Sequence, residues 1–387
     1  MKFFHISDLH IGKQLHHYSL RGDQKDILEK IVEAAKREKP DALLLAGDIY
    51  DSSVPSAEAV ELFDFFLTRF SDALPKTSVL VIAGNHDSGK RLSFASEILK
   101  KHRIYVAGLP PVEDGEFIRK VVLEDRWGRV NFYLLPFTKP SHLRKFREEP
   151  FSSYQEGIEF LLGREQIDRD ERNVILSHQF YTASGKKPIQ SDSEVVTVGG
   201  IDQVDVSVLK DFDYAALGHI HKPQNMGKTI RYCGTPLAYS VSEADQEKSI
   251  TAVTLEEKGK EPRICEIPLK PLHRVRKFKG RLQEILEMDE GSAREDYVSI
   301  TLTDDIEAYE PMEQLKELYH RILELSVDNK RTRTVMDFSM EDVEEMQPLT
   351  AFVQFFQEMN GREMSEDERN LAEKIIVRCT VEKGEGA

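Results

Sequence analysis

Short apolar runs alternate with amphipathic stretches along the first two thirds of the chain. The runs "ALLLAG" at 42–47 and "VLVIAG" at 79–84 have the length of buried strands, and residues 23–38 and 56–70 show helical spacing. Further strands are predicted within "KFFHIS" at the start and at 130–136, 173–178, 214–219 and 249–255. This alternation predicts an α/β domain in which helices cover largely parallel sheets.

The pattern changes near residues 266–272, where "IPLKPLH" places two prolines around a short basic segment. Beyond it, helix candidates at 281–288 and 311–325 flank the strand-like "DYVSITLTD", which predicts a small α+β unit. The last segment carries apolar residues at helical spacing, and a second helix begins at a capping box, Ser365 to Glu368. We therefore predict three consecutive units, at 1–268, 269–336 and 337–387.

Length and cysteine usage limit the class of protein. A chain of 387 residues exceeds one ordinary single-core domain. No run approaches about 18 consecutive apolar residues, and "MKFFHISDLH" contains no apolar signal stretch, so we expect a cytoplasmic protein without a membrane contact. Cys233, Cys265 and Cys379 form no C-x-x-C pair, which fits a reducing compartment and disfavours a structural zinc site.

Acidic residues outnumber basic ones, 68 against 53, which gives a formal net charge of −15. This total disfavours nucleic-acid binding, because nucleic-acid binders usually carry a basic surface. However, carboxylates that bind metal ions count as negative charge only until the ions neutralise them. The distribution of the charges is therefore more informative than their sum.

Polar side chains follow five of the predicted strands directly. They are Asp8 and His10 in "SDLH", Asp48 and Asp51 in "GDIYD", Asn85, His86 and Asp87 in "GNHD", His178 in "ILSH", and His219 and His221 in "GHIH". Ligands of α/β sheets bind at the carboxyl ends of the strands. Carboxylates and neutral imidazoles suit manganese, iron or zinc, and one carboxylate bridges two ions in two-metal sites. A single histidine is more often structural, but five strand ends together predict a two-metal centre.

In their order, D-x-H, GD-x-x-D, GNHD, a lone His and GH-x-H resemble the calcineurin-like metallophosphoesterase superfamily. The resemblance implies a sandwich of two sheets flanked by helices. It also implies one metal ion held by Asp8, His10 and His221, and a second held by Asn85, His178 and His219, with Asp48 bridging. His86 would be the general acid that protonates the leaving oxygen, held by Asp87 or a neighbouring carboxylate, with Asp51 in a supporting position.

A narrower resemblance is carried by "HISDLHIGKQLHH", "LLLAGDIYDSSVPS" and "VLVIAGNHDSGKRLSFAS", which look like the SbcD family of bacterial nuclease subunits. Protein phosphatases of the superfamily instead read GD-x-x-D-R-G and GNHE. The SbcD resemblance implies a manganese-dependent 3′–5′ exonuclease on duplex ends that also cuts single strands and hairpins. It implies a homodimer within a heterotetramer with an SbcC-like, SMC-type ATPase. This chain has no G-x-x-x-x-G-K-[ST] motif, so any ATP turnover would belong to the partner.

Two other functions stay open at this point. One is a metallophosphoesterase that acts on nucleotides or cyclic nucleotides, for which residues 270–387 would be dispensable. The other is a non-catalytic scaffold in which the metal ions only hold the fold. The presence of His86 argues against the scaffold, because a degenerate site would be expected to lose its proton donor first.

The SbcD resemblance also implies contact surfaces. The capping unit 269–336 would help to bind DNA through a basic run that includes Arg274, Arg276, Lys277 and Lys279, although a solvated edge strand explains these charges equally well. His16 and His17 lie where related nucleases place a DNA-contacting histidine, or simply in an exposed loop. Dimerisation is implied for the apolar helix 56–70, with Leu62 and Phe66 as candidates, and burial against the sheet is the alternative.

The C-terminal segment has a different charge. Residues 337–368 carry ten acidic residues and one basic residue, with apolar side chains between them. Such a segment would not bind DNA or a membrane surface. The resemblance implies that it holds the partner ATPase through Leu349, Phe352, Val353 and Phe356, and packing onto its own chain is the alternative.

Overall fold

The structure is a computed structural model that describes residues 1–183, 185–194, 202–288, 293–304 and 310–328, with isolated positions between 349 and 373. The chain divides into two compact units. One comprises Met1–Phe278, Leu286–Ile300 and Met312–Leu325, and the other comprises Lys279–Ile285, Thr301–Pro311 and Ser326–Ala387. Because each unit is built from separate segments, the three consecutive units expected from the sequence stay a prediction.

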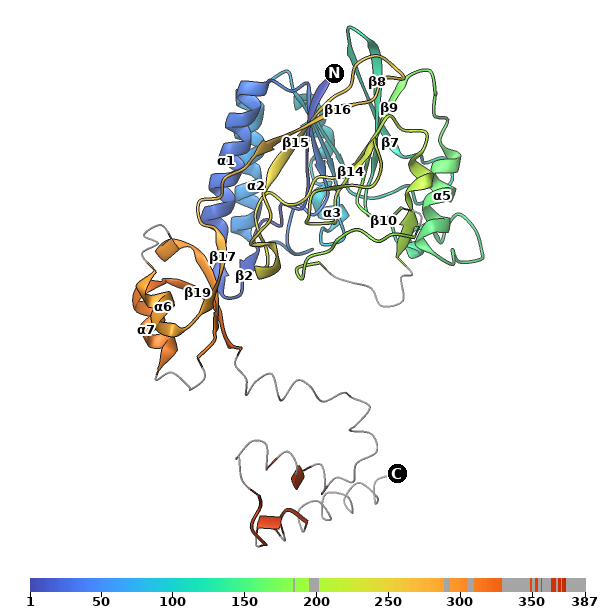
Figure 1. Ribbon diagram of the computed structural model, residues 1–387. Helices are drawn as coiled ribbons and strands as arrows, with labels where there is room; N and C mark the ends of the chain where they lie inside the picture. The colour runs from blue at the N-terminus through green and yellow to red at the C-terminus, as the bar shows by residue number, and fades with distance from the viewer. Residues whose placement is uncertain are drawn as a thin grey trace. The chain divides into compact units, whose positions relative to one another are not determined.

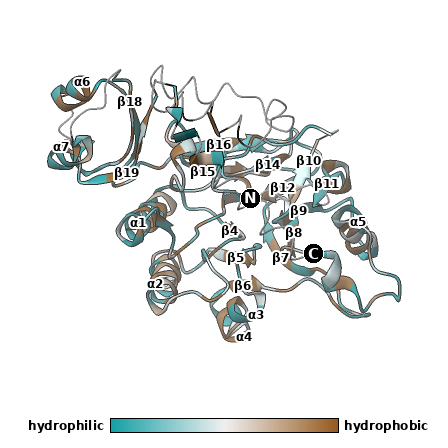
Figure 2. Cartoon of the chain, turned by 90° about the horizontal axis from the view of Figure 1, so that it is seen from below, coloured by the Kyte–Doolittle hydropathy of each residue, from teal (hydrophilic) through white to brown (hydrophobic). Residues whose placement is uncertain are grey.

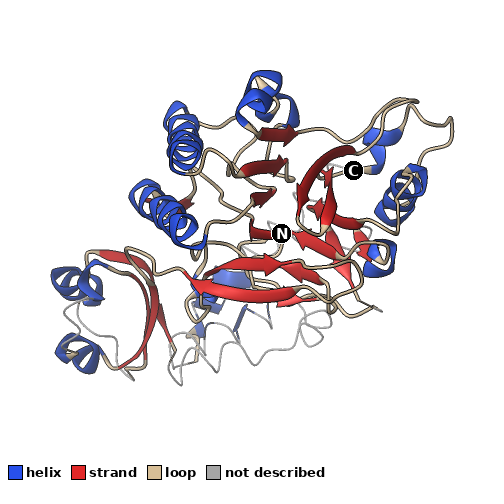
Figure 3. Cartoon of the chain, turned by 90° about the horizontal axis from the view of Figure 1, so that it is seen from above, coloured by secondary structure: helices blue, strands red, loops and turns tan. Residues whose placement is uncertain are grey.

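Among the described residues of the larger unit, two six-stranded sheets pack face to face (Figures 1 and 3). The first is ordered β16-β15-β1-β4-β5-β6 and the second β13-β14-β12-β9-β8-β7. The first sheet comprises β16 (Arg263–Pro268), β15 (Ser249–Thr254), β1 (Lys2–Ile6), β4 (Ala42–Ala46), β5 (Ser78–Ile82) and β6 (Ile104–Ala107). The second comprises β13 (Gln224–Asn225), β14 (Ile230–Tyr232), β12 (Tyr214–Leu217), β9 (Arg172–Ser177), β8 (Gly128–Leu135) and β7 (Arg119–Asp125). The predicted sandwich is confirmed.

Four neighbouring strands of each sheet pair in parallel, and antiparallel pairs lie at its margins. β1, β4, β5 and β6 pair in parallel, with β15 antiparallel to β1. In the second sheet β8, β9, β12 and β14 pair in parallel, with β7 and β13 antiparallel at its two edges. The parallel strands therefore end together at one edge of each sheet.

Both faces of the central strands are buried, which explains why their sequences are continuous apolar runs. In β4, Leu44 belongs to the layer between the two sheets, whereas Leu43 and Leu45 belong to the cluster beneath the outer helices. Successive side chains of a strand point to opposite faces, so both layers are filled from one run. Between the sheets, Phe3 meets Phe132 with ring centroids 5.7 Å apart.

Helices cover the outer face of each sheet (Figure 3). α1 (Arg21–Glu38) and α2 (Ala57–Ala73) pack on the first sheet, and α5 (Tyr154–Arg164) packs on the second. Hydrophobic and hydrophilic residues alternate along these helices, as an amphipathic helix requires (Figure 2). Ser56 caps α2, because its Oγ accepts a hydrogen bond from the backbone N–H of Ala59 at 3.3 Å.

Shorter elements complete this unit. They are β2 (Gln14–Leu15), β3 (Tyr18–Ser19), α3 (Gly89–Leu92), α4 (Ser96–Leu99), β10 (Phe180–Thr182), β11 (Gln203–Asp205) and the 3₁₀ turns Lys100–His102, Pro140–Leu143, Val206–Leu209, Val241–Glu243 and Ala293–Glu295. No helix in the described part of the chain combines the length and apolar character needed to cross a bilayer.

The structure corrects the predicted dimer contacts on α2. Leu62 is 6% exposed and Phe66 is 1% exposed, because both pack into the core beneath the helix. Neither side chain is available to a second copy of the chain. Exposed apolar side chains lie instead on and between α3 and α4, where Phe94 is 83% exposed and Ile98 is 62% exposed.

A three-stranded sheet with two helices follows residue 268, so helices and strands alternate here as the sequence pattern suggests. It comprises β17 (Val275–Gly280), β18 (Tyr297–Leu302) and β19 (Arg321–Val327), with α6 (Leu282–Glu287) and α7 (Pro311–Leu318). The helix predicted for 311–325 is wrong in its second half, which forms β19. Leu323, Leu325 and Val327 alternate with polar residues, and this period of two suits a strand.

The C-terminal candidates are only partly described. Leu349, Phe352, Val353 and Phe356 are each in helical conformation, and Phe352 is 42% exposed. Residues 337–348 lie outside the described part of the chain. The predicted partner-binding role of these four side chains stays a prediction.

His5 gives the fold an expected sensitivity to acid. Its ring is fully buried in β1, 3.0 Å from the Tyr214 hydroxyl, and burial followed by the Arg231 charge lowers its pKa from 6.5 to about 3. Between these values the unfolded chain binds a proton that the folded chain does not. The contribution of His5 to the free energy of unfolding is therefore fully present above pH 6.5 and is lost as the pH drops toward 3. We expect a loss of about 1.4 kcal/mol per pH unit. In His5→Asn, the free energy of unfolding measured with urea should fall less steeply as the pH drops. An equal pH dependence in the wild type and the variant would show that His5 does not cause the acid sensitivity.

Candidate metal centre

The side chains predicted to bind metal converge at the carboxyl ends of strands from both sheets. In the first sheet, Asp8 and His10 follow β1, Asp48 follows β4 and Asn85 follows β5. In the second, His178 follows β9, and His219 and His221 follow β12. Packing of the two sheets therefore assembles the group, because each sheet alone supplies only part of it.

The ligand atoms of these residues lie within reach of shared cations. Within each of the groups Asp8–His10–His221 and Asp8–Asp48–His178, the candidate ligand atoms lie within 4.8 Å of one another. Asn85 joins through its Oδ1, which is 3.1 Å from His178 Nε2 and 3.0 Å from His219 Nδ1. Asp48 Oδ2 lies 3.2 Å from His178 Nε2 and 3.8 Å from His10 Nε2. Asp48 thus stands between the two sets.

Unsatisfied polar atoms show that this set fits metal ions. His10 is 1% exposed, and its ring nitrogens make no hydrogen bond of good geometry: the nearby carboxylate oxygens are Asp51 Oδ1, 3.2 Å from Nδ1, and Asp48 Oδ2, 3.8 Å from Nε2. Leaving a buried polar atom without a partner costs about 1–3 kcal/mol. The buried carboxylates Asp8 and Asp48 lie beside it without an arginine or lysine among their hydrogen-bonded or ion-paired partners in the described residues. A pair of divalent cations would satisfy both the nitrogens and the charge.

The protonation of the histidines is set by burial and by the carboxylates. Burial, followed by the neighbouring His178, lowers the pKa of His219 to about 3, which leaves the neutral imidazole that metal ions require. Burial alone would lower the pKa of His178, but Asp48 and Asp8 raise it to about 9. His178 Nδ1 donates to the Ala46 carbonyl at 2.7 Å, which directs Nε2 toward Asp48.

Backbone strain is concentrated at the same residues. Asp8, His10, Asp48 and His219 adopt positive φ angles of 52°, 42°, 49° and 98°. Such conformations cost on the order of 1–3 kcal/mol each for residues other than glycine, and they are typical of functional sites. Gly84 allows a close approach here, because a Cβ at this position would lie 2.1 Å from Asp48 Oδ1.

Comparison with known proteins agrees with this geometry. Residues 1–223 match the family of calcineurin-like phosphoesterases, and residues 268–360 match the SbcD C-terminal family, described as the type 5 capsule protein repressor C-terminal domain. The SbcD component of the SbcCD nuclease of Staphylococcus epidermidis is 30% identical over 97% of this chain and 98% of its own length. The chain belongs to the SbcD family of calcineurin-like phosphoesterases.

A second SbcD relative, from Staphylococcus saprophyticus, is 29% identical over 97% of this chain and 98% of its own length. Among solved structures, a dimetal phosphatase from Danio rerio aligns with a TM-score of 0.38 at 15% identity, over 70% of this chain and 99% of that chain. This global likeness is too low to carry an argument. The SbcD assignment rests on the sequence matches.

The predicted acid of this chain, His86, is oriented by the backbone. Its Nδ1 lies 3.0 Å from the Asp51 carbonyl oxygen, and its backbone N–H donates to Asp48 Oδ1 at 2.8 Å. The Asp51 side chain accepts from Lys13 Nζ at 2.8 Å and lies 3.2 Å from His10 Nδ1. Asp51 therefore supports both histidines, one through its carbonyl and the other through its carboxylate.

Asp87 has a different role from the one expected. Its carboxylate accepts backbone N–H bonds from Ile49 at 3.1 Å, Tyr50 at 2.9 Å and Gly84 at 2.9 Å. It therefore joins the loops that follow β4 and β5. No hydrogen bond between Asp87 and His86 occurs in this described region, so the expectation that a carboxylate holds the His86 ring is corrected to the Asp51 carbonyl.

The predicted DNA contacts fall into two groups. His16 and His17 are exposed, and His16 lines a hollow together with Lys13, Ser193 and Tyr239. His17 instead lies against Tyr18, with ring centroids 4.1 Å apart. Of the two histidines, His16 is therefore the one that lines this hollow.

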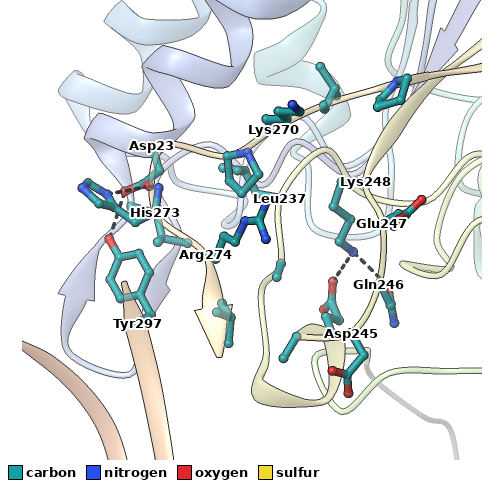
Figure 4. A pocket seen from close by; sticks show the side chains of 18 residues that line it. Asp23, Leu237, Asp245, Gln246, Glu247, Lys248, Lys270, His273, Arg274 and Tyr297 are labelled. Carbon is teal, nitrogen blue, oxygen red and sulfur yellow. Dashed lines mark hydrogen bonds and ion pairs between the residues drawn. The ribbon is translucent and has the colours of Figure 1, made fainter. Parts of the chain in front are cut away.

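The basic run is largely paired with acidic residues. Arg276 Nε lies 2.6 Å from Asp296, Lys277 Nζ lies 3.4 Å from Asp245, and Lys279 Nζ lies 2.5 Å from Asp328. Arg274 lines a separate cavity (Figure 4). These pairings reduce the positive charge that the sequence suggested for this segment.

Several residues that support the site carried no signal in the sequence. Gln24 Nε2 on α1 donates to the His10 carbonyl at 2.7 Å. The Tyr239 hydroxyl donates to the Leu9 carbonyl, and its ring packs 5.4 Å from that of His10. Glu243 Oε1 lies 3.3 Å from His221 Nδ1, and Lys248 Nζ donates to the His221 carbonyl at 3.4 Å. None of them belongs to a motif, because each reaches the site from a distant element.

Proposed function

We propose that this chain is the nuclease component of an SbcCD-type complex. It hydrolyses DNA phosphodiesters as a manganese-dependent 3′–5′ exonuclease on duplex ends and as an endonuclease on single strands and hairpins. The observation that carries the proposal is the largely buried Asp–His–Asn group with His86 at its margin. The two relatives that the chain matches over almost its whole length are named as nuclease components.

The metal ions would be divided between two sets of side chains. Asp8, His10 and His221 would hold one ion, Asn85, His178 and His219 would hold the other, and Asp48 would bind both. Bound there, the ions would supply an activated water and positive charge for the phosphoryl oxygens. The mixed oxygen and nitrogen donors favour manganese over magnesium or calcium.

His86 supplies the proton for the leaving oxygen. Because its Nδ1 donates to the Asp51 carbonyl, the proton to be transferred must reside on Nε2. The hydrogen bond from the His86 backbone N–H to Asp48 ties the acid to the carboxylate shared by both sets. Half-burial leaves the ring accessible to a substrate.

We further propose that DNA and an SbcC-like, SMC-type ATPase are the partners, in the cytoplasm. The exposed His16 beside Lys13 supports a DNA contact near the metal centre. The helical Leu349, Phe352, Val353 and Phe356 support a partner contact in the acidic C-terminal segment. A homodimer within the heterotetramer would use the exposed α3–α4 surface.

The dimer surface can be tested with matched variants. Phe94→Ser with Ile98→Ser should convert a dimer to a monomer in analytical ultracentrifugation, with the free energy of unfolding nearly unchanged, because both side chains are exposed. Phe66→Ala should instead lower the free energy of unfolding by about 3–5 kcal/mol, because it opens a cavity in the core. A dimer that survives the double substitution would place the interface elsewhere.

The activity is tested with duplexes labelled at either end. We expect the purified chain to release nucleotides from 3′ ends with Mn²⁺ and to be inactive with chelator. Cyclic nucleotides and a small phosphodiester serve as comparison substrates. Turnover of these without DNA cleavage would favour the alternative, a nucleotide or cyclic-nucleotide phosphoesterase, and the C-terminal units would need another explanation.

A further inference from the structure

A buried ion pair lies directly behind His221. Glu243, the last residue of the 3₁₀ turn Val241–Glu243, is fully buried, and Lys248, just before β15, is 6% exposed. Lys248 Nζ lies 2.6 Å from Glu243 Oε2. A buried pair of this kind often stabilises a fold no better than apolar residues of the same size. Its position beside a candidate metal ligand is therefore the informative observation.

The pair is anchored by neighbouring polar groups. Lys248 Nζ also donates to Thr235 Oγ1 at 2.7 Å and to Gln246 Oε1 at 2.9 Å. Both residues of the pair line a cavity of about 350 Å³, and Figure 4 shows the Lys248 side chain with Gln246 as one of its partners. These contacts fix Glu243 Oε2 on Lys248, which leaves Oε1 to face His221.

The tautomer of His221 follows from the single hydroxyl proton of Ser193. Ser193 Oγ donates to Glu243 Oε1 at 2.5 Å and lies 2.7 Å from His221 Nδ1. A serine hydroxyl has one proton, and the carboxylate takes it. Ser193 Oγ must therefore accept from His221, so Nδ1 carries hydrogen. Nε2 is then the nitrogen whose lone pair is free for a cation.

The backbone of His221 is held by the same neighbourhood. Its N–H donates to Glu194 Oε1 at 2.8 Å, and its carbonyl accepts from Thr235 N at 3.1 Å and from Lys248 Nζ at 3.4 Å. By contrast, the Nδ1 of His178 bonds the Ala46 carbonyl. The Nδ1 of His178 is thus held by a backbone carbonyl, whereas the Nδ1 of His221 is held by side chains.

We propose that Glu243, oriented by Lys248, is the positioning residue of His221. Through Ser193, and directly across 3.3 Å, Glu243 Oε1 holds the tautomer that presents Nε2 to a metal ion. This inference rests on the proposed metal centre. It identifies a carboxylate–serine–histidine relay that the sequence motifs do not contain.

Glu243→Gln is expected to reverse the relay. Lys248 has only protons to offer, so it would take the glutamine oxygen and turn the glutamine NH₂ toward Ser193. Ser193 would then accept from the glutamine and donate to His221 Nδ1, which places the His221 proton on Nε2. We expect calorimetric titration of the metal-free full chain with Mn²⁺ to show about 10–100-fold weaker binding at one of two sites.

Two variants separate positioning from simple loss of structure. Ser193→Ala should weaken Mn²⁺ binding by less than about 3-fold, because Glu243 Oε1 lies 3.3 Å from His221 Nδ1 and can accept its hydrogen bond directly. Loss of the group that orients a metal ligand would instead weaken binding by about 10–100-fold. Asp125→Asn weakens the partly buried Asp125–Arg172 pair and should lower stability without changing Mn²⁺ affinity. Equal losses of affinity in Glu243→Gln and Asp125→Asn would overturn the positioning role.

The wild-type chain offers a direct test that needs no folded Glu243 variant. ¹⁵N spectra of histidine-labelled, metal-free chain at alkaline pH should show the Nδ1–H tautomer for His221, identified by its absence in His221→Asn. The Nε2–H tautomer would overturn the proposal. If the wild-type chain binds two Mn²⁺ ions and Glu243→Gln binds them with the same affinity, the positioning role of Glu243 is overturned and the proposed function is not. Wild type that binds no Mn²⁺ would overturn the proposed function and this role with it.

Discussion

Replacement of His86 by serine is expected to slow DNA cleavage by about 10²–10⁴-fold while two metal ions remain bound. The reason is chemical: a serine hydroxyl does not release its proton to a leaving oxygen near neutral pH, whereas a protonated imidazole does. The structure adds that the His86 backbone N–H still bonds Asp48 in the variant, because serine keeps this group. The metal-binding carboxylate should therefore keep its place.

The measurement combines rate and occupancy. Cleavage of an end-labelled duplex under single-turnover conditions gives the rate, and Mn²⁺ calorimetry gives the number of ions. His102→Ser serves as the control, because His102 is exposed on the 3₁₀ turn Lys100–His102. Unchanged cleavage in His86→Ser would remove His86 as the acid. Loss of one metal ion would instead make His86 a ligand, which its place in a group with His10 and Asp51 allows.

Asp48→Asn is expected to weaken metal binding by more than about 10²-fold, since even the groups that orient a ligand typically contribute 10–100-fold. Asp48 is 2% exposed and stands between His178 at 3.2 Å and His10 at 3.8 Å. Asparagine keeps the shape but removes the charge and replaces one oxygen by a donor. A donor cannot bind a cation, and the single remaining oxygen cannot serve two ions while also accepting from His86.

Calorimetry with Mn²⁺ and the cleavage rate should fall together in Asp48→Asn. Asp41→Asn is a suitable control, because Asp41 is an exposed carboxylate just before the same strand and accepts only backbone donation from Lys2 among the hydrogen bonds of the described residues. Circular dichroism should show both variants folded. Two ions bound with wild-type affinity by Asp48→Asn would contradict the bridging role.

Local sequence was sufficient for the strands and for the ligand candidates. β4 and β5 are continuous apolar runs that a glycine ends, and a polar residue then follows where the strand leaves the sheet. The period of the apolar residues is a local property, so strands buried on both faces are visible in one sequence. By the same argument, the residues after five strands could be predicted to meet at one edge.

Predictions that depended on distant neighbours were less successful. Leu62 and Phe66 suggested an interface because the helix carries more aromatic surface than one face needs, yet the sheet and α1 bury them. Residues 321–325 fall within the stretch predicted as a helix but form part of β19 beside β18. In each case tertiary packing decided between two structures that the local pattern allows.

The sequence by itself determined which residues carry the chemistry of this protein, because metal ligands and a proton donor must be particular side chains at strand ends. Only the tertiary structure decided how they are held. Asp87 joins two loops, the Asp51 carbonyl orients His86, and Glu243 reaches His221 through Ser193. Such contacts join residues up to about fifty positions apart, and a hydrogen bond leaves no periodic trace in either partner's sequence.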